Sequence, residues 1–168
     1  MTVDEAFQQA LEYERRIRDQ YVEAATEALI PEAKAFYKIL GLDEESHVAY
    51  IEHKLEQWKS TGQAGVDRPV SVLPPTADLI AAIARAKSQF EAIPEGGQMA
   101  ALQNALKAER ETSAFYRSVM TKLPDSAAGI FARLLEIEDG HTAIVQAELD
   151  LVSETGHWFD VREFSMED

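Results

Sequence analysis

Apolar residues recur every three or four positions along four long stretches of the chain, which is the pattern of helices that each bury one face. Thr2 and Glu5 form a capping box before the first stretch, and Pro31 suits the first turn of the second. Pro124 closes the third stretch and Gly156 ends the fourth. We therefore predict long helices over about residues 3–29, 31–60, 97–123 and 125–154.

The segment between the second and third helices, residues 61–96, has a different character. Its first part, TGQAGVDRPVSVLPP, holds three prolines and two glycines and predicts an irregular connection. Thr76 is placed to cap a short helix over about residues 77–93, which the sequence PEGG would end. A crossover with a short extra helix is therefore expected here.

The remaining links are short, so the first and second helices, and the third and fourth, should each pair as an antiparallel hairpin. A chain of 168 residues with 46% hydrophobic content is sufficient for one core and too short for two. We predict an all-α fold in a single domain, residues 1–168: a four-helix bundle of two antiparallel helical hairpins, the crossover 61–96 and a C-terminal tail 155–168.

Polar residues interrupt the apolar faces of the second and fourth helices. Glu44 and His47 occupy positions where the pattern of the second helix calls for apolar residues. Glu138 and His141 occupy such positions in the fourth helix. A buried carboxylate or imidazole is costly unless another group compensates it. Because residues three apart share a helix face, each Glu-x-x-His pair offers an oxygen and a nitrogen to one point.

The first and third helices carry a glutamate on the same inward face, at Glu14 and Glu109, and a tyrosine follows each by seven residues, at Tyr21 and Tyr116. The two glutamates are 95 residues apart, and the two Glu-x-x-His pairs are 94 apart. The second hairpin therefore repeats the polar residues of the first.

Four carboxylates buried together would repel one another and take up protons. Two divalent cations would balance their four negative charges, and two neutral imidazoles would complete the ligand set. Oxygen-rich ligation with one nitrogen per metal suits two iron ions, with manganese as the alternative, whereas zinc prefers fewer carboxylates. The predicted metal ligands are Glu14, Glu44, His47, Glu109, Glu138 and His141.

The composition narrows the classes of function. The net charge of −14 disfavours nucleic acid and anionic membrane surfaces as partners. The chain has no cysteine, which excludes disulfides, iron–sulfur clusters and thiol nucleophiles. Without a long apolar run or an apolar leader, we expect a cytoplasmic protein that does not enter a membrane.

The six candidate ligands resemble the di-metal site of the ferritin-like superfamily, in which one Glu from each of two helices joins Glu-x-x-His from each of the other two. The resemblance covers all four long helices and the crossover. It implies a ferritin-like bundle in which Glu44 and Glu138 bridge or chelate the metals and Glu14 and Glu109 complete the set.

Within this superfamily the chain looks most like the rubrerythrin side, in a form that lacks a rubredoxin domain. That resemblance implies a di-iron oxidoreductase that reduces hydrogen peroxide or oxygen. It also implies an external electron donor, such as a rubredoxin-like or flavin protein, and a homodimer. Tyr21 and Tyr116 are then either core aromatics bonded to a carboxylate or electron-donating tyrosines beside the ligands.

The chain departs from the best-known members of that group. A further glutamate, three residues after the third-helix ligand, is replaced here by Thr112, and its first-helix counterpart is Ile17. Six ligands without it resemble bacterioferritin, but Glu45 stands where that family has a haem-binding methionine, so no haem is expected. Ferroxidase activity with iron storage is therefore one alternative function, and a non-catalytic helical interaction protein is another.

Overall fold

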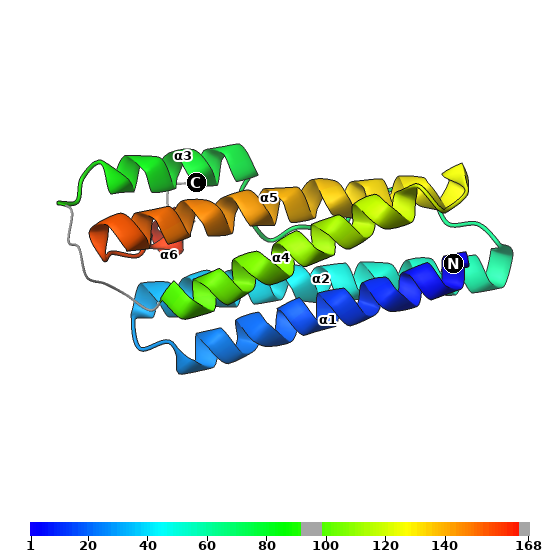
Figure 1. Cartoon of the computed structure of the whole chain (residues 1–168), viewed down its shortest axis with the longest axis horizontal. Coiled ribbons are helices and arrows are strands. Elements are labelled where there is room, and N and C mark those ends of the chain that lie inside the picture. Colours follow the sequence, from blue (N-terminus) through cyan, green and yellow to red (C-terminus); the bar gives the residue numbers. More distant parts are fainter. Residues whose placement is uncertain (92–98, 165–168) are drawn as a thin grey trace.

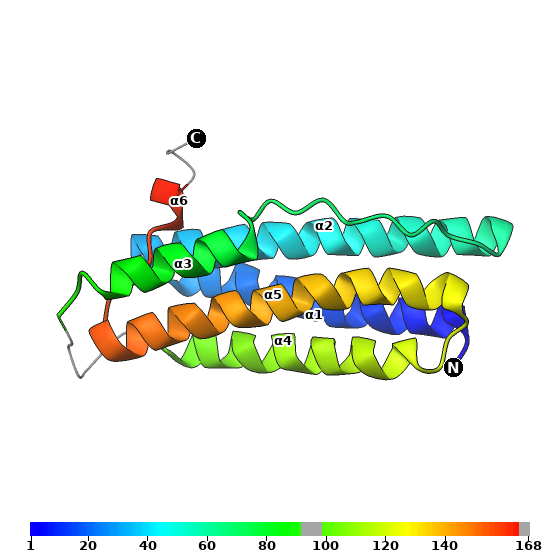
Figure 2. The ribbon, with the colours of Figure 1, turned by 90° about the horizontal axis from the view of Figure 1, so that it is seen from above.

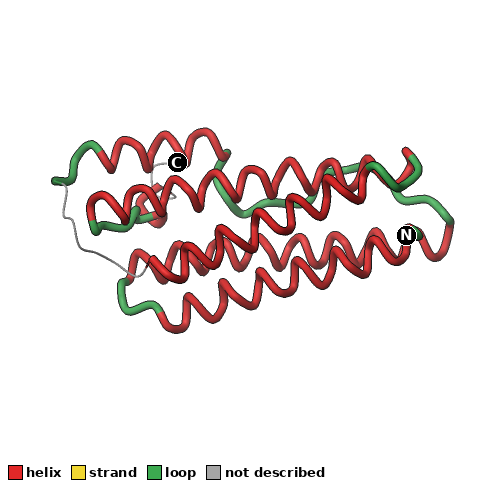
Figure 3. Tube along the Cα trace, viewed as in Figure 1, coloured by secondary structure: helices red, strands yellow, loops and turns green. Residues whose placement is uncertain are grey.

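The computed structural model describes residues 1–91 and 99–164, and within them the chain forms six helices and no strand (Figure 3). This confirms the predicted all-helical fold for the described part of the chain. The helices are α1 (Val3–Glu27), α2 (Pro31–Thr61), α3 (Thr76–Lys87), α4 (Met99–Met120), α5 (Asp125–Thr155) and α6 (Val161–Phe164).

The four long helices lie side by side as a bundle (Figure 1). Helix α1 packs along α2 and α4 packs along α5, and each pair is joined by a short link, so both pairs are antiparallel hairpins. The crossover returns along the outside of α2 before α3 packs on α5 (Figure 2). As a result, α2 and α4 run in the same direction through the bundle.

Most of the predicted helix ends agree with the structure. Thr2 and Glu5 form a reciprocal capping box at the start of α1, and Pro31 occupies the first turn of α2. Gly62 and Gly156 follow α2 and α5 in the left-handed conformation, with φ of 68° and 69°, which costs glycine nothing because it has no Cβ.

The prediction for the short helix was wrong in two respects. Thr76 does not cap α3; it is the first helical residue, and Pro75 stands at the cap position without a side-chain hydrogen bond. The helix also ends at Lys87, because the next backbone bonds, such as that from Gln89 to Ala86, close tighter turns than an α-helix. The expected end at PEGG and the first two residues of the predicted third helix lie outside the described residues.

The described part of the C-terminal tail contains a short helix, α6. Helix α6 packs against α2, and the preceding Trp158 is buried in the core. No helix among the described residues is both long and apolar enough to cross a membrane.

The apolar core is divided into two clusters by a polar layer. One cluster, beside α3 and the tail, includes Tyr37, Leu40 and Trp158. The other, at the opposite end of the bundle, includes Phe7 and Phe131. The predicted ligands stand on each long helix where the residues of one cluster give way to those of the other. The polar layer therefore lies across the middle of the bundle.

Side chains on one face of α2 hold the crossover in place. Tyr50 donates a hydrogen bond to the carbonyl of Asp67 at 2.8 Å, and Ser46 donates to the carbonyl of Val70. Lys54, which is only 2% exposed, forms an ion pair with the Asp67 carboxylate. These contacts recur every three or four residues, so one helical face carries them all.

Candidate metal centre

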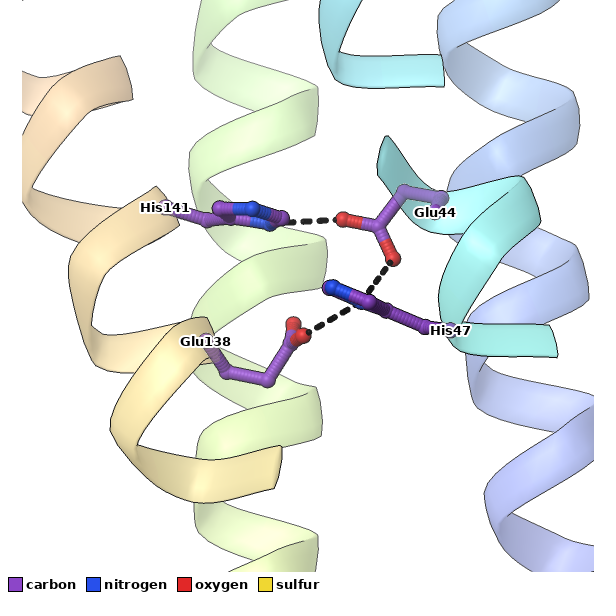
Figure 4. Close-up of side chains that lie close together, drawn as sticks. All are labelled: Glu44, His47, Glu138 and His141. Carbon is purple, nitrogen blue, oxygen red and sulfur yellow. Dashed lines mark hydrogen bonds and ion pairs between the residues drawn. The ribbon is translucent and has the colours of Figure 1, made fainter. Parts of the chain in front are cut away.

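All six predicted ligands are buried, with side chains at most 2% exposed, and they come from the four long helices. The structure brings ligand atoms of Glu44, His47, Glu138 and His141 within 4.8 Å of one another. Figure 4 shows these four side chains converging from α2 and α5. Such a group can hold metal, and the coordination itself remains a prediction.

The carboxylate of Glu44 lies between the two imidazoles. Its Oε1 atom is 2.7 Å from Nδ1 of His141, and its Oε2 atom is 3.2 Å from Nδ1 of His47 (Figure 4). Oε1 of Glu138 is also 3.2 Å from Nδ1 of His47. Both histidines therefore direct Nδ1 to the centre, and one carboxylate reaches both.

Glu14 and Glu109 lie beside different histidines of this group of four. Oε2 of Glu14 is 3.3 Å from Nδ1 of His47, whereas Oε1 of Glu109 is 3.8 Å from Nδ1 of His141. The six residues thus divide into two halves, each with one histidine and one outer glutamate, while Glu44 reaches the histidines of both.

The two tyrosines pair with the outer glutamates across the bundle. Tyr21 of α1 donates a hydrogen bond to Oε1 of Glu109 on α4, and Tyr116 of α4 donates to Oε1 of Glu14 on α1. Each tyrosine therefore bonds to the glutamate of the other hairpin, and this symmetry agrees with the internal repeat in the sequence. The structure bears out the hydrogen bonds to carboxylates; electron donation by these tyrosines remains a prediction.

Asp43 is a site residue that the sequence interpretation missed. Its Oδ2 atom is 2.8 Å from Nε2 of His141 and 3.5 Å from Nε2 of His47. Its Oδ1 atom accepts hydrogen bonds from the Ser71 hydroxyl at 2.8 Å and from the Val72 backbone N–H at 2.6 Å. One carboxylate therefore orients the far side of both imidazoles and is itself held by the crossover.

One signal for Asp43 was present in the sequence, because it precedes His47 by one helical turn and residues four apart share a face. The contact with the crossover could not be inferred, since it depends on how residues 71–72 pass over α2. Asp43 also has no equivalent in the second hairpin, where Ile137 precedes Glu138.

The electrostatics of the site reflect its crowding. Burial would lower the pKa of both imidazoles, but nearby carboxylates, Glu44 foremost, raise the pKa of His47 and His141 well above the usual value. Burial raises the pKa of Asp43, but hydrogen bonds from the two histidines outweigh it and hold that pKa well below its usual range. Burial followed by repulsion from Glu44 and Glu138 raises the pKa of Glu109.

The tyrosine hydroxyls are held in their neutral form. Burial, followed by the charge of Glu109, raises the pKa of Tyr21 well above its usual value, and burial with the charge of Glu14 does the same for Tyr116. Both phenols therefore remain hydrogen-bond donors to their glutamates at neutral pH.

A pair of metal ions fits these residues. Within the described residues, Oε2 of Glu138 and Oε2 of Glu109 are buried without a hydrogen-bond partner. Buried polar atoms are rarely left so, because the loss of hydration is not repaid. Two divalent ions would supply the missing partners and balance four carboxylates, while the histidines would lose protons to bind them.

The positions that depart from the rubrerythrin pattern do not add ligands. The Thr112 hydroxyl donates to the carbonyl of Ala108 in its own helix at 3.0 Å, and Ile17 is a buried apolar residue. Neither side chain provides a further carboxylate.

Two surface pockets lead toward the centre. One, of about 420 Å³, lies between α1 and α4 and is lined by Tyr21 and Ala105. The other, of about 370 Å³, lies between the crossover and α5 and is lined by Arg68, Arg133 and His141. Of the candidate ligands, only His141 lines either pocket.

Comparisons of the chain with models of protein families, with curated proteins and with solved structures find no match. The geometry of the site and the pattern of the sequence are therefore the basis for assigning a function.

Proposed function

We propose that this chain is a di-iron oxidoreductase, rubrerythrin-like, that reduces hydrogen peroxide with electrons from an external donor. The observation that carries the proposal is the position of Glu44, whose two oxygens face Nδ1 of His47 and Nδ1 of His141. A carboxylate so placed suits a bridge between two metal ions. Glu14 and Glu109 supply one outer oxygen ligand on each side.

The arrangement of helices supports a ferritin-like topology. Two antiparallel hairpins are joined by a connection that runs the length of the bundle, as in ferritin-like folds with one long crossover. The internal repeat of glutamate, tyrosine and Glu-x-x-His agrees with this topology.

The donor set favours iron, with manganese as the alternative. Each half of the site offers one imidazole nitrogen and otherwise carboxylate oxygens, which suits these metals better than zinc. Two ferrous ions held there would supply the two electrons that the reduction of peroxide needs.

The residues of the chain prepare the site for this chemistry. Asp43 holds both imidazoles with Nε2 outward, so that Nδ1 remains available at the centre. Tyr21 and Tyr116 each fix one oxygen of an outer glutamate by donating a hydrogen bond. Because all these groups are buried, bulk water is excluded from the centre.

A return to the ferrous state needs electrons from outside, because a chain without cysteine cannot bind an iron–sulfur cluster or rubredoxin-type iron of its own. The proposal therefore includes a separate reductant, such as a rubredoxin-like or flavin protein. It also includes a homodimer in the cytoplasm, with peroxide preferred over oxygen and neither nucleic acid nor membrane as a partner.

The test combines metal analysis with rapid mixing. Anaerobic loading should give about two iron ions per chain, and stopped-flow mixing should oxidise the ferrous protein faster with peroxide than with oxygen. Glu138→Gln should abolish both results, whereas Glu136→Gln, an exposed position on the same helix, should retain them. Activity should continue beyond one turnover only with added reductant.

Other outcomes would redirect the assignment. Faster oxidation by oxygen, followed by growth of a mineral core in a large assembly, would indicate iron storage. A protein that takes up no iron after loading would contradict both metal functions and favour a helical interaction protein.

A further inference from the structure

A row of aromatic rings leads from the metal centre toward the surface. The Tyr21 hydroxyl donates to Glu109, one of the outer ligands. The ring centroid of Tyr21 is 6.4 Å from that of Tyr37, and the Tyr37 centroid is 5.5 Å from that of Trp158. The three side chains come from α1, α2 and the segment before α6.

The outer end of the row reaches a surface pocket. Trp158 is 6% exposed and lines a pocket of about 440 Å³ at the end of the bundle that carries α6 (Figure 1). Phe90 and His157 stand beside it in the same pocket, with ring centroids 4.2 Å apart. The row therefore joins the buried site to a place where another molecule can bind.

The polar atoms of the two outer side chains, Tyr37 and Trp158, make no hydrogen bond within the described residues. The Tyr37 hydroxyl and Nε1 of Trp158 are buried with no partner among residues 1–91 and 99–164, although such groups usually find one. A phenylalanine would fill the position of Tyr37 without losing a hydrogen bond. The presence of tyrosine and tryptophan, the two oxidisable aromatic side chains, thus needs another reason.

We propose that Tyr21, Tyr37 and Trp158 form a relay that carries single electrons from a reductant bound at this pocket to the metal centre. The proposal rests on the proposed function, because the relay needs a strong oxidant at its inner end. The distances between ring centroids support the relay, because each ring is a direct neighbour of the next and an electron needs no further side chain to pass between them.

The relay can supply the missing electron for peroxide reduction when the metal pair has already lost one of its two electrons. Hydrogen peroxide takes two electrons and two protons to give two waters: a half-oxidised metal pair would supply one electron, Tyr21 would supply the other, and solvent would supply both protons. Tyr37 then reduces Tyr21, Trp158 reduces Tyr37, and a one-electron reductant at the pocket restores Trp158. Each phenol releases its proton on oxidation and regains it on reduction, so the chain ends unchanged.

The proposal assigns the proton of Tyr37 to Glu148, the carboxylate whose charge acts on that phenol. This side chain is fully buried, its charge acts on Tyr37, and its Oε2 atom has no partner in the described part of the chain. Its other oxygen accepts the Phe159 backbone N–H at 2.9 Å. Burial raises the pKa of Glu148 to about 8, so the acceptor is largely ionised at pH about 9.

The relay can be tested on the metal-free protein. The chain has no cysteine, so Glu163→Cys, at an exposed position lining the pocket, gives a single attachment point for a ruthenium polypyridyl photo-oxidant. A flash at pH about 9, with a sacrificial electron acceptor present, should oxidise Trp158 and then produce a tyrosyl radical on Tyr21. Electron paramagnetic resonance and transient absorption detect both.

Variants in the labelled protein assign the radicals. Trp158→Phe and Tyr37→Phe should each abolish the Tyr21 radical, and Tyr21→Phe should leave a radical on Tyr37. Trp58→Phe and Tyr116→Phe, which lie outside the row, should leave the Tyr21 radical intact. A Tyr21 radical that persists in both Trp158→Phe and Tyr37→Phe would overturn the relay. Because no metal is used, this result is independent of whether the proposed di-iron function holds.

Discussion

Asp43 couples the ligands to the crossover at the scale of a single residue. One of its oxygens contacts Nε2 of His141, and the other accepts from Ser71 and Val72. A partner of this kind fixes which imidazole nitrogen carries the proton and how the ring is oriented. The position of the crossover and the geometry of the metal ligands should therefore depend on the same side chain.

Asp43→Asn should weaken iron binding by about 10- to 100-fold, because an amide has one acceptor oxygen and cannot accept from the imidazoles on one side and from Ser71 and Val72 on the other. Titration against a competing chelator measures the change. Ser71→Ala, which removes one hydrogen bond to Asp43 and leaves its contact with His141, is the control and should bind iron nearly as well as the parent protein. Unchanged affinity in Asp43→Asn would show that the carboxylate does not support the ligands.

Glu148 gives a second prediction, for the stability of the metal-free protein. Burial raises its pKa from 4.5 to about 8, so the folded protein binds a proton that the unfolded chain releases. Its contribution to stability is complete below pH 4.5 and is lost as the pH rises through 8. At about 1.4 kcal/mol per pKa unit, the loss is roughly 4–5 kcal/mol.

Glu148→Gln should therefore increase the free energy of unfolding above pH 8 and change it little near pH 4.5. The glutamine side chain can still accept the Phe159 N–H. Urea unfolding of the metal-free protein across this pH range measures the difference. Glu154→Gln, at an exposed position on the same helix, should show no such pH-dependent gain. Equal stabilities of variant and parent at high pH would contradict the prediction.

At the scale of elements, we expect that the crossover can be loosened while the four long helices stay folded. Lys54 is buried, while its partner Asp67 is 68% exposed. Asp67→Ala leaves the ammonium group buried without its partner and should cost about 1–3 kcal/mol. Lys54→Met removes the charge and keeps the apolar volume, so it should cost less while loosening the crossover.

Hydrogen exchange and urea unfolding distinguish the two effects. In Lys54→Met, amides of residues 62–72 should exchange faster while those of the four long helices keep their protection. If Lys54→Met lowered the free energy of unfolding more than Asp67→Ala, the ion pair would not be the principal contact of Lys54.

The long helices were predictable from the sequence because their signals are local. The capping box at Thr2, Pro31 in a first turn and Gly156 after a last turn each depend on neighbouring residues. The end of α3 was not predictable in this way, since its apolar period continues after Lys87 while the backbone turns more tightly.

The same distinction applies to the candidate site. Glu44 and His47 stood out because they break an apolar period on their own helix. The exchange of partners between Tyr21 and Tyr116 depends on how α1 faces α4, and the contacts of Asp43 depend on the path of the crossover. Contacts made by another element leave no periodic signal in the sequence.

At the scale of the whole molecule, the polar layer weakens the metal-free protein at the centre of its core. The carboxylates of Glu44, Glu109 and Glu138 are fully buried, and burial, followed by repulsion from the other two, raises the pKa of Glu109. Metal ions that bind only the folded chain would stabilise it by mass action. The two apolar clusters on either side of the layer keep the helices packed when metal is removed.

Glu109→Ala should therefore abolish the stabilisation by iron and leave the metal-free protein helical, with an unchanged or higher melting temperature, because one buried carboxylate has been removed. Circular dichroism with and without anaerobic iron measures both effects. Glu111→Ala, at an exposed position on the same helix, should keep the iron-dependent increase. A large loss of helicity in metal-free Glu109→Ala would mean that the carboxylate, through its bond from Tyr21, holds the bundle together.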